Sequence, residues 1–227
     1  IFASEMKAIL EHNQFETPTI NPVALDRYFT YRYTPGDDTV VFGIKKLRPG
    51  YILIFENGKT RTQQYWNLTY ATNSRSVEEN AQIVLDQLTK AVKERMVSDV
   101  PLGAYLSGGL DSSAIVALMA EQSDNPIKTF SVSFPYEKED EGKYARRVAE
   151  EFKTDHHQLE VKKDAFSVLP KVVWHLDEPL ADASCIPTYL MSELTKKHVT
   201  VVLSGEGSDE LFAGYNKYKY AMLARHA

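Results

Sequence analysis

Residues 105–113 of the chain read Tyr105-Leu106-Ser107-Gly108-Gly109-Leu110-Asp111-Ser112-Ser113. An apolar run from Val100 to Leu106 leads into this stretch, and another from Ala114 to Ala120 follows it. This order predicts a strand, a glycine turn and the beginning of a helix. Paired glycines let the backbone turn sharply and present bare N–H groups, and the positive end of the helix dipole strengthens their field. The stretch therefore predicts an anion-binding loop, with phosphate as the expected ligand.

The spacing of this loop differs from that of two common nucleotide-binding motifs. It lacks the third glycine of the dinucleotide fingerprint and the Gly-Lys-Ser/Thr ending of the Walker loop. The pattern Ser-Gly-Gly-x-Asp-Ser resembles instead the pyrophosphate loop of ATP pyrophosphatases, enzymes that split ATP between its α and β phosphates. The alternative interpretation is a plain strand-to-helix turn in which Asp111 and Ser112 only cap the helix.

Composition narrows the class of protein. The chain has 227 residues, of which 43% are hydrophobic and 25% charged, which is ordinary for a globular protein with a sizeable core. Its net charge of -5 argues against a nucleic-acid surface, because phosphate backbones favour basic faces. Small molecules are therefore the expected partners, and nucleic acid is not.

Cysteine content and apolar runs bear on the location of the protein. The single cysteine, Cys185, cannot form an internal disulfide, which is typical of a reducing compartment and favours the cytoplasm. Apolar runs such as Val199 to Leu203 are too short to span a bilayer, so we expect no membrane partner. The opening Ile1-Phe2-Ala3 lacks an initiator methionine, so we expect a fragment of a longer protein.

The first 70 residues are expected to form the antiparallel end of one domain, with roles in packing and interfaces. Two helices and three strands are expected here, at 4–11, 23–29, 40–44, 51–55 and 60–65. The turn Glu56-Asn57-Gly58-Lys59 is a hairpin signal between the last two strands. A polar linker spans 67–75, and the capping box Ser76-Val77-Glu78-Glu79 opens a new helix. We therefore predict two domains, 1–70 and 71–227.

Strands alternate with helices through the second domain. Strands are expected at 100–106, 128–134, 154–161 and 199–203, with helices between them that include one capped by Asp164 and one over 184–196. This alternation predicts right-handed crossovers and a parallel sheet covered by helices on both faces, an α/β fold. Ligands of such sheets bind at the carboxyl ends of the strands. Leu106, Val132 and Leu203 lie late in three strands, so the loops after them are expected to converge on one site.

The loop after the last strand carries a second motif, Ser204-Gly205-Glu206-Gly207-Ser208-Asp209-Glu210. Its glycines again free the backbone for a close approach, and it holds three carboxylates. Carboxylates beside a polyphosphate require a bridging cation, and Mg²⁺ suits one or two carboxylates together with phosphate oxygens and water. Asp111 and Asp209 can supply that pair if their strands are neighbours. The alternative is an acidic helix N-terminus that needs no metal.

Together the two motifs resemble those of the glutamine-dependent asparagine synthetases. Ser107 to Ser112 matches the family's pyrophosphate loop, and Leu203 to Glu210 matches its second signature. The stretches Asp182-Ala183-Ser184 and Pro187 to Met191 resemble the segment that precedes this signature. The resemblance implies an ATP-pyrophosphatase domain of the adenine nucleotide alpha hydrolase-like fold. Residues 1 to about 70 look like the end of an N-terminal nucleophile, class II glutaminase domain.

The resemblance also implies roles for single residues. It implies that asparagine is made from aspartate through β-aspartyl-AMP, with ATP, Mg²⁺ and ammonia from glutamine, in a possible homodimer. Asp111 and Asp209 match the magnesium ligands, and Glu206 matches a glutamate linked to forming and consuming the acyl-adenylate. The implied nucleotide-binding residues are Leu106, Ser107, Gly108, Gly109, Asp111, Ser112, Val132, Ser204 and Gly205.

The chain also departs from the family. Glutamine hydrolysis in the family uses an N-terminal cysteine, whereas this chain has only Cys185, so we expect that activity to lie outside these residues. The family continues past Ala227 with a lysine that contacts the reacting phosphate. Two other functions stay open: a related ATP pyrophosphatase that acts on another carboxylic acid, such as a β-lactam-type synthetase, and a binding module without catalysis.

Three other groups of residues receive structural interpretations. The neighbours His156 and His157 are expected on opposite faces of a strand, so we do not expect them to share a metal ion. His175, with Asp177 and Glu178 just before Pro179, is interpreted as a helix end, because proline restricts the residue before it. The tyrosines at 215, 218 and 220 are interpreted as helix packing rather than as a base-stacking platform.

Overall fold

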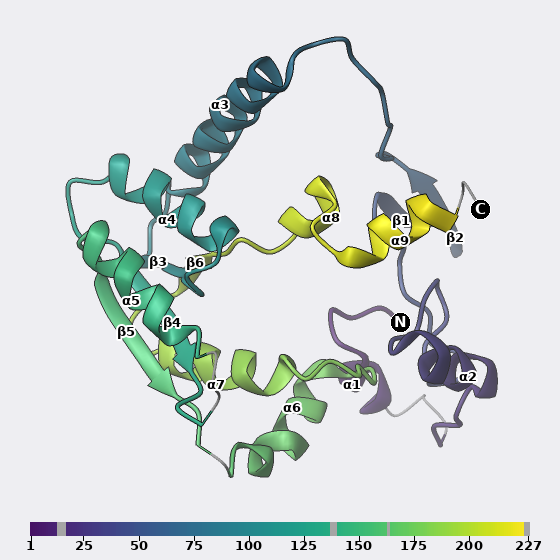
Figure 1. The fold of residues 1–227 in the computed structure, drawn as a ribbon. Coiled ribbons are helices and arrows are strands. Elements are labelled where there is room, and N and C mark those ends of the chain that lie inside the picture. The colour runs from purple at the N-terminus through teal and green to yellow at the C-terminus, as the bar shows by residue number, and fades with distance from the viewer. Residues whose placement is uncertain (13–16, 137–139, 163, 225–227) are drawn as a thin grey trace. The chain divides into compact units, whose positions relative to one another are not determined.

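A computed structural model describes residues 1–12, 17–136, 140–162 and 164–224 (Figure 1). The chain divides into two compact units. The first unit comprises residues 1–74 together with 166–186, and the second comprises residues 75–165 and 187–227. The expected domain boundary near residue 70 stays a prediction.

The second unit is built on a four-stranded sheet in the order β5-β4-β3-β6. Its strands are β3 (Leu102–Tyr105), β4 (Lys128–Ser133), β5 (Asp155–Glu160) and β6 (Val201–Leu203). Every neighbouring pair is parallel, and the register pairs Ala104 with both Thr129 and Leu203. The expected parallel sheet is therefore confirmed. Because β3 lies between β4 and β6, the loops after these three strands leave the same edge of the sheet side by side.

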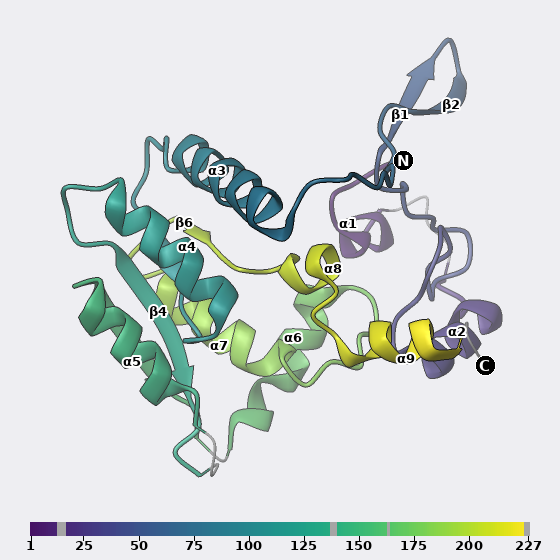
Figure 2. The ribbon, with the colours of Figure 1, turned by 45° about the horizontal axis from the view of Figure 1, so that its top comes forward.

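Helices cover both faces of this sheet, as expected (Figure 2). The helices of the unit are α3 (Val77–Arg95), α4 (Leu110–Glu121), α5 (Gly142–Glu151), α7 (Cys185–Thr195), α8 (Ser208–Phe212) and α9 (Asn216–Ala224). α5 packs on one face, where Gly142 approaches Ser133 of β4. α7 contacts the opposite face, where the hydroxyls of Ser192 and Tyr105 lie 3.1 Å apart.

The core of the second unit lies between the sheet and the helices α4 and α5. Ala104, Leu106, Val116 and Met119 are almost completely buried there. In α3, Val92 is buried and Leu88 and Met96 pack against the core, whereas Ile83 and Leu85 are about half exposed. Only the C-terminal half of this helix therefore contacts the core.

The starts of two helices test the predicted caps. Ser76 and Glu79 form the expected capping box, with Glu79 N–H donating to Ser76 Oγ at 3.1 Å and Ser76 N–H to Glu79 Oε2 at 2.8 Å. The prediction for Asp164 is wrong. A short 3₁₀ helix, Ala165–Val168, follows it, and α6 (Leu169–Leu176) begins only after Val168. Pro170 in the first turn of α6 explains this start, because its fixed φ suits that position and its missing N–H is not needed there.

The first unit contains two short helices and a hairpin from residues 1–74, and α6 from its second segment, residues 166–186. Its elements are α1 (Met6–Leu10), α2 (Pro22–Tyr31), β1 (Tyr51–Glu56) and β2 (Lys59–Gln64). β1 and β2 are antiparallel, and Asn57 and Gly58 turn between them with positive φ, as their sequence predicts. The strand expected at 40–44 is wrong. The Thr39 hydroxyl donates to the carbonyls of Val41 and Ile44 and holds a turn there instead.

The end of α6 confirms the helix-end interpretation around Pro179. The helix stops at Leu176, and Asp177 follows with a φ of 60°. Asp177 accepts a hydrogen bond from Met6 N–H and pairs with Lys7, both at 2.7 Å, so this turn joins α6 to α1 within the first unit. In the described part of the chain, no helix is long and apolar enough to cross a membrane.

Candidate functional site: two glycine loops around one cavity

The first glycine loop joins β3 to α4. Gly109 occupies the N-cap of α4, so Asp111 and Ser112 lie inside the first turn instead of capping it. The Ser112 hydroxyl lies 2.9 Å from Ser107 Oγ and accepts from Ser107 N–H at 3.2 Å. Gly109 N–H donates to Ser107 Oγ at 3.2 Å. These contacts stabilise a tight loop ahead of a helix N-terminus, the arrangement that favours an anion.

The second glycine loop follows β6 and touches the first. A Cβ on Gly205 would lie 2.8 Å from the Ser112 nitrogen and 2.9 Å from Asp111 Cβ. Glycine is thus required here because the backbones of the two loops are in direct contact. Ser208 Oγ donates to the Gly205 carbonyl at 2.8 Å and closes this loop before α8. The expectation that loops after neighbouring strands converge is confirmed.

The two loops line a cavity of 420 Å³, which we call the two-loop cavity. It contains every residue predicted for the site except Gly108 and Gly109. Gly109 serves as the N-cap of α4, and Gly108, with a φ of +81°, packs against the backbone of α5. The residues from the prediction that line it are Leu106, Ser107, Asp111, Ser112, Val132, Ser204, Gly205, Glu206 and Asp209.

The lining also contains residues that sequence reasoning missed. These are Tyr105, Ser131, Glu141, Thr188, Met191, Gly207, Glu210 and Tyr215. Gly207 and Glu210 belong to the second motif, and Thr188 and Met191 to the segment quoted before it, so their place in the sequence was a usable signal. Glu141 carried no signal, because it stands in an acidic connection without a motif.

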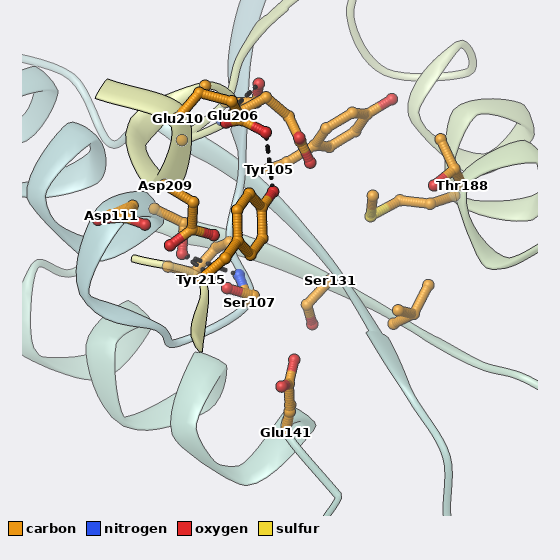
Figure 3. A pocket seen from close by; sticks show the side chains of 17 residues that line it. Tyr105, Ser107, Asp111, Ser131, Glu141, Thr188, Glu206, Asp209, Glu210 and Tyr215 are labelled. Atoms are coloured by element: carbon orange, nitrogen blue, oxygen red, sulfur yellow. Dashed lines mark hydrogen bonds between the residues drawn. The ribbon is translucent and has the colours of Figure 1, made fainter. Parts of the chain in front are cut away.

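The walls of the two-loop cavity are acidic. Five of the lining residues carry a carboxylate, and among the described lining residues there is no lysine, arginine or histidine. Figure 3 shows Asp111 and Asp209 close together on one side of the cavity, whereas Glu141 lies below Ser131. A Cβ on Gly214 would overlap the Asp209 carboxylate, so this glycine leaves the room in which that side chain sits. A polyanionic ligand here needs a cation to offset five negative charges.

Tyr215 bounds the cavity beside the second loop. Its hydroxyl donates to Glu210 Oε1 at 2.9 Å, as the dashed line in Figure 3 shows. This hydrogen bond to a carboxylate, with some burial, raises the pKa of Tyr215 to about 12. Tyr215 precedes α9, where its ring lies 6.0 Å from that of Tyr218, and it also lines the cavity, a position that the sequence did not indicate. The ring also makes a cation–π contact with the ammonium of Lys217, which lies 4.4 Å from the ring centre.

A half-buried histidine lies behind one wall of the cavity. His156 Nδ1 lies 2.8 Å from Thr129 Oγ1, and its Nε2 lies 3.1 Å from Ser131 Oγ, while Ser131 itself lines the cavity. Burial lowers the pKa of His156, and the nearby His157 and Arg146 lower it further, so the ring is neutral at neutral pH. One ring nitrogen then donates and the other accepts.

The neighbouring histidine points the other way, as the strand alternation predicts. The ring of His157 stacks on Phe130 at 5.4 Å and lies 4.0 Å from the ring of His198. Within the described ranges, no group of three or more histidine, cysteine, aspartate or glutamate side chains is arranged to hold a metal ion.

Comparison with known proteins assigns the chain to a family. A model of the asparagine synthase family matches residues 84–227, which include both glycine loops. The chain belongs to the asparagine synthase family. A model of the glutamine amidotransferase domain matches residues 1–66, ahead of the asparagine synthase match.

Individual relatives of the asparagine synthase family agree with this assignment. The chain is 41% identical over 224 residues to a putative glutamine-hydrolysing asparagine synthetase 2 of Methanocaldococcus jannaschii, covering 95% of this chain and 42% of that protein. It is 37% identical over 221 residues to the glutamine-hydrolysing asparagine synthetase 1 of Bacillus subtilis, covering 96% and 34%. The chain thus spans less than half the length of these curated relatives. Among solved structures, an NH3-dependent NAD synthetase from Campylobacter jejuni matches with a TM-score of 0.44 at 13% identity over 60% of each chain, a likeness too low to bear on the assignment.

Proposed function

We propose that the complete protein makes asparagine from aspartate, ATP and ammonia derived from glutamine, and that this chain supplies the ATP-binding half of the reaction. The observation that carries the proposal is the contact between the two glycine loops, which brings Asp111 and Asp209 to one cavity. Membership of the asparagine synthase family supports the choice of reaction. The relatives named as glutamine-hydrolysing asparagine synthetases support the choice of substrates.

The residues of the cavity suit Mg²⁺ with a polyphosphate. Mg²⁺ is commonly held by one or two carboxylates, with phosphate oxygens and water completing its shell. Asp111 and Asp209 provide such a pair, and the excess of carboxylates over cations in the cavity makes a metal necessary for any polyphosphate. Bound Mg²⁺ would offset the charge that develops on the departing pyrophosphate. In our proposal, the loop from Ser107 to Ser112 holds the pyrophosphate through its amides and hydroxyls.

Adenylation is the first chemical step that we propose. A carboxylate oxygen of aspartate attacks the α-phosphorus of ATP, and the bond from that phosphorus to the bridging oxygen breaks, which releases pyrophosphate and leaves β-aspartyl-AMP. This step is needed because oxide is an impossible leaving group, whereas AMP leaves readily. The backbone near Leu106, Val132, Ser204 and Gly205 holds the nucleoside, and amides aimed at the phosphates stabilise the developing charge.

Amide formation is the second step. The nitrogen of ammonia attacks the β-carbonyl carbon of β-aspartyl-AMP and forms a cationic tetrahedral centre. Loss of a proton from that nitrogen and cleavage of the bond to AMP give asparagine. Glu206 lines the cavity and has no ion-pair partner among the described residues, so it can accept the proton as a general base.

The decisive experiment measures products of the complete protein. With aspartate, MgATP and either ammonium or glutamine, we expect asparagine and AMP in equal amounts. A panel of other carboxylic acids tests the alternative that a related acid is the substrate, and lack of pyrophosphate exchange with every acid would support the non-catalytic alternative. Asp111→Ala and Asp209→Ala should each abolish Mg²⁺-dependent exchange but retain glutamine hydrolysis. Normal adenylation of aspartate by either variant would rule out the shared metal.

A further inference from the structure

Glu141 supplies the carboxylate on the side of the two-loop cavity opposite Asp111 and Asp209. Its carboxylate points into the cavity toward Ser131, as Figure 3 shows. Ser131 and Val132, near the end of β4, line the same side. The proposed reaction gives no role to this carboxylate. No ion pair to it is found among the described residues either, so its charge is available to a ligand.

The turn before Glu141 is anchored to β4 by the preceding carboxylate. Asp140 accepts hydrogen bonds from Ser133 Oγ at 2.7 Å, from Phe134 N–H at 3.0 Å and from Gly142 N–H at 3.1 Å. Burial by itself would raise the pKa of Asp140, but these three donors outweigh it and lower that pKa below the usual value. Asp140 is thus a fixed anion that ties the start of α5 to the end of β4.

The first turn of α5 fixes the backbone of Glu141 from the other side. The Glu141 carbonyl accepts hydrogen bonds from Tyr144 N–H at 2.9 Å and from Ala145 N–H at 3.1 Å. A Cβ on Gly108 would lie 2.4 Å from the Ala145 nitrogen and 2.5 Å from the Tyr144 carbonyl carbon. Tyr144 and Ala145, in the first turn of α5, therefore lie directly against the glycine loop proposed to hold the phosphates. Glu141, the N-cap of α5, lies one helical turn before these two residues.

The position along a nucleotide follows from this packing. In ATP the ribose is bonded directly to the phosphates, and adenine lies beyond it. A side chain one helical turn from the phosphate loop is therefore placed to reach the sugar. A carboxylate accepts two hydrogen bonds, and the two vicinal hydroxyls of ribose donate two. Hydrogen bonds to an ionised acceptor are also shorter and stronger than those between neutral groups.

We propose that Glu141 accepts hydrogen bonds from the ribose hydroxyls of the nucleotide and makes the site selective for ribonucleotides over deoxyribonucleotides. This inference rests on the proposed ATP site. A glutamate at a helix N-terminus is also favoured by the helix dipole. That effect alone would change the stability of α5 and leave the preference between sugars unchanged.

The test compares binding of three nucleotides to the complete protein. Calorimetry in the presence of Mg²⁺ gives the Kd for ATP, 2′-deoxy-ATP and 3′-deoxy-ATP with the wild type, Glu141→Gln and Glu141→Ala. Hydrogen bonds to charged groups imply that the wild type binds ATP about tenfold more tightly than either deoxy analogue. Glu141→Ala removes both hydrogen bonds to ATP but only the one that each analogue keeps, so it should weaken ATP binding more than the binding of either analogue and abolish the preference for ATP. Glu150→Gln removes a charge from an exposed site at the other end of α5 and should alter none of these values.

The direction in which nucleotide affinity changes distinguishes a hydrogen bond to the sugar from electrostatic repulsion between Glu141 and the phosphates. Removing a carboxylate near a polyphosphate reduces repulsion and should tighten the binding of all three nucleotides equally. A selective loss for ATP therefore requires a hydrogen bond to its sugar. Equal affinities of the wild type for the three nucleotides, or an equal change for all three in Glu141→Ala, would overturn the inference. The inference would also be overturned if Glu141→Ala changed only the preference between ATP and inosine triphosphate. That result would mean that Glu141 contacts the adenine amino group and not the sugar.

Failure of the proposed reaction would give different results from failure of the proposed contact between Glu141 and the sugar. A protein that prefers the ribonucleotide through Glu141 but releases no AMP with aspartate would refute the reaction and retain the sugar contact. Asparagine formation without any sugar preference would refute the contact and retain the reaction. A wild type that binds no ATP would overturn both. Thermal unfolding of Glu141→Ala, compared with Glu150→Gln, measures the contribution of Glu141 to the stability of α5.

Discussion

Replacing Gly205 by alanine should separate the two loops of the cavity. The new Cβ would lie 2.8 Å from the Ser112 nitrogen, 2.9 Å from Asp111 Cβ and 3.0 Å from the Asp111 carbonyl carbon. Ordinary contact begins at 3.4 Å, so the loops must move apart by about 0.6 Å, the difference between 2.8 and 3.4 Å. The atoms in the way belong to the first turn of α4 and cannot swing aside as the end of a long side chain can.

Two consequences of Gly205→Ala can be estimated. Overpacking of this kind costs roughly 1–3 kcal/mol in the free energy of unfolding. A misplacement of about 1 Å in a reacting constellation can cost on the order of a hundredfold in rate, so the smaller shift here should cost roughly tenfold. The φ of Gly205 is not positive, so steric overlap rather than backbone strain is the expected cause.

The assay is the Mg²⁺-dependent exchange of labelled pyrophosphate into ATP with aspartate, run beside thermal unfolding. Gly103→Ala is the matched control, because its Cβ would lie 2.7 Å from the Lys128 carbonyl oxygen and 2.9 Å from Phe130 Cε2, inside the sheet and outside the cavity lining. It should lose similar stability but keep its exchange rate per folded molecule. Exchange by Gly205→Ala within about twofold of the wild type would refute the reasoning, as would an equal loss in the control.

Three further predictions concern pH and capping. The pKa of His156 is lowered from 6.5 by burial, so wild-type stability should fall as pH drops below 6.5, and urea unfolding across pH should show a flatter dependence in His156→Gln. The pKa of Tyr215 is raised from 10.0 to about 12 by Glu210, so the stability it contributes is complete below pH 10 and lost toward pH 12. Titration of tyrosinate absorbance should show one less late-ionising group in Tyr215→Phe, and an unchanged curve would contradict this hydrogen bond. Ser76→Ala removes the capping box of α3 and should cost about 1 kcal/mol in unfolding free energy, whereas an unchanged melting temperature would mean that the cap is energetically silent.

Local patterns predicted most elements because their causes are local. The capping box at Ser76, the hairpin turn at Asn57-Gly58 and the glycine loop from Ser107 to Ser112 depend on residues within a few positions of one another. Two predicted elements were wrong because a neighbouring side chain that the pattern did not take into account changed the local backbone. A hydroxyl at Thr39 turned an expected strand into a turn, and Pro170 set the start of α6 in place of Asp164.

The residues of the site likewise fall into those that the sequence identified and those that only the structure revealed. The two glycine motifs and their carboxylates, Asp111 and Asp209, were identifiable from the sequence because the spacing within each loop is short. Tyr215 and Glu141 were not, because both lie outside the motifs and reach the cavity only through folding. Ser131 was equally hidden, since nothing in its neighbourhood along the chain indicates that it lies between His156 and the cavity.

The sequence by itself determined the alternation of strands and helices, both glycine loops and the resemblance to the asparagine synthase family, since each depends on short-range order along the chain. Only the tertiary structure decided that Gly205 touches Asp111 and that Glu141 shares their cavity. The physical reason is the strand order of the sheet, which places β3 between β4 and β6 and thereby joins three loops that are far apart in sequence. Pairing across a sheet depends on register and packing between distant segments, and no local pattern encodes it.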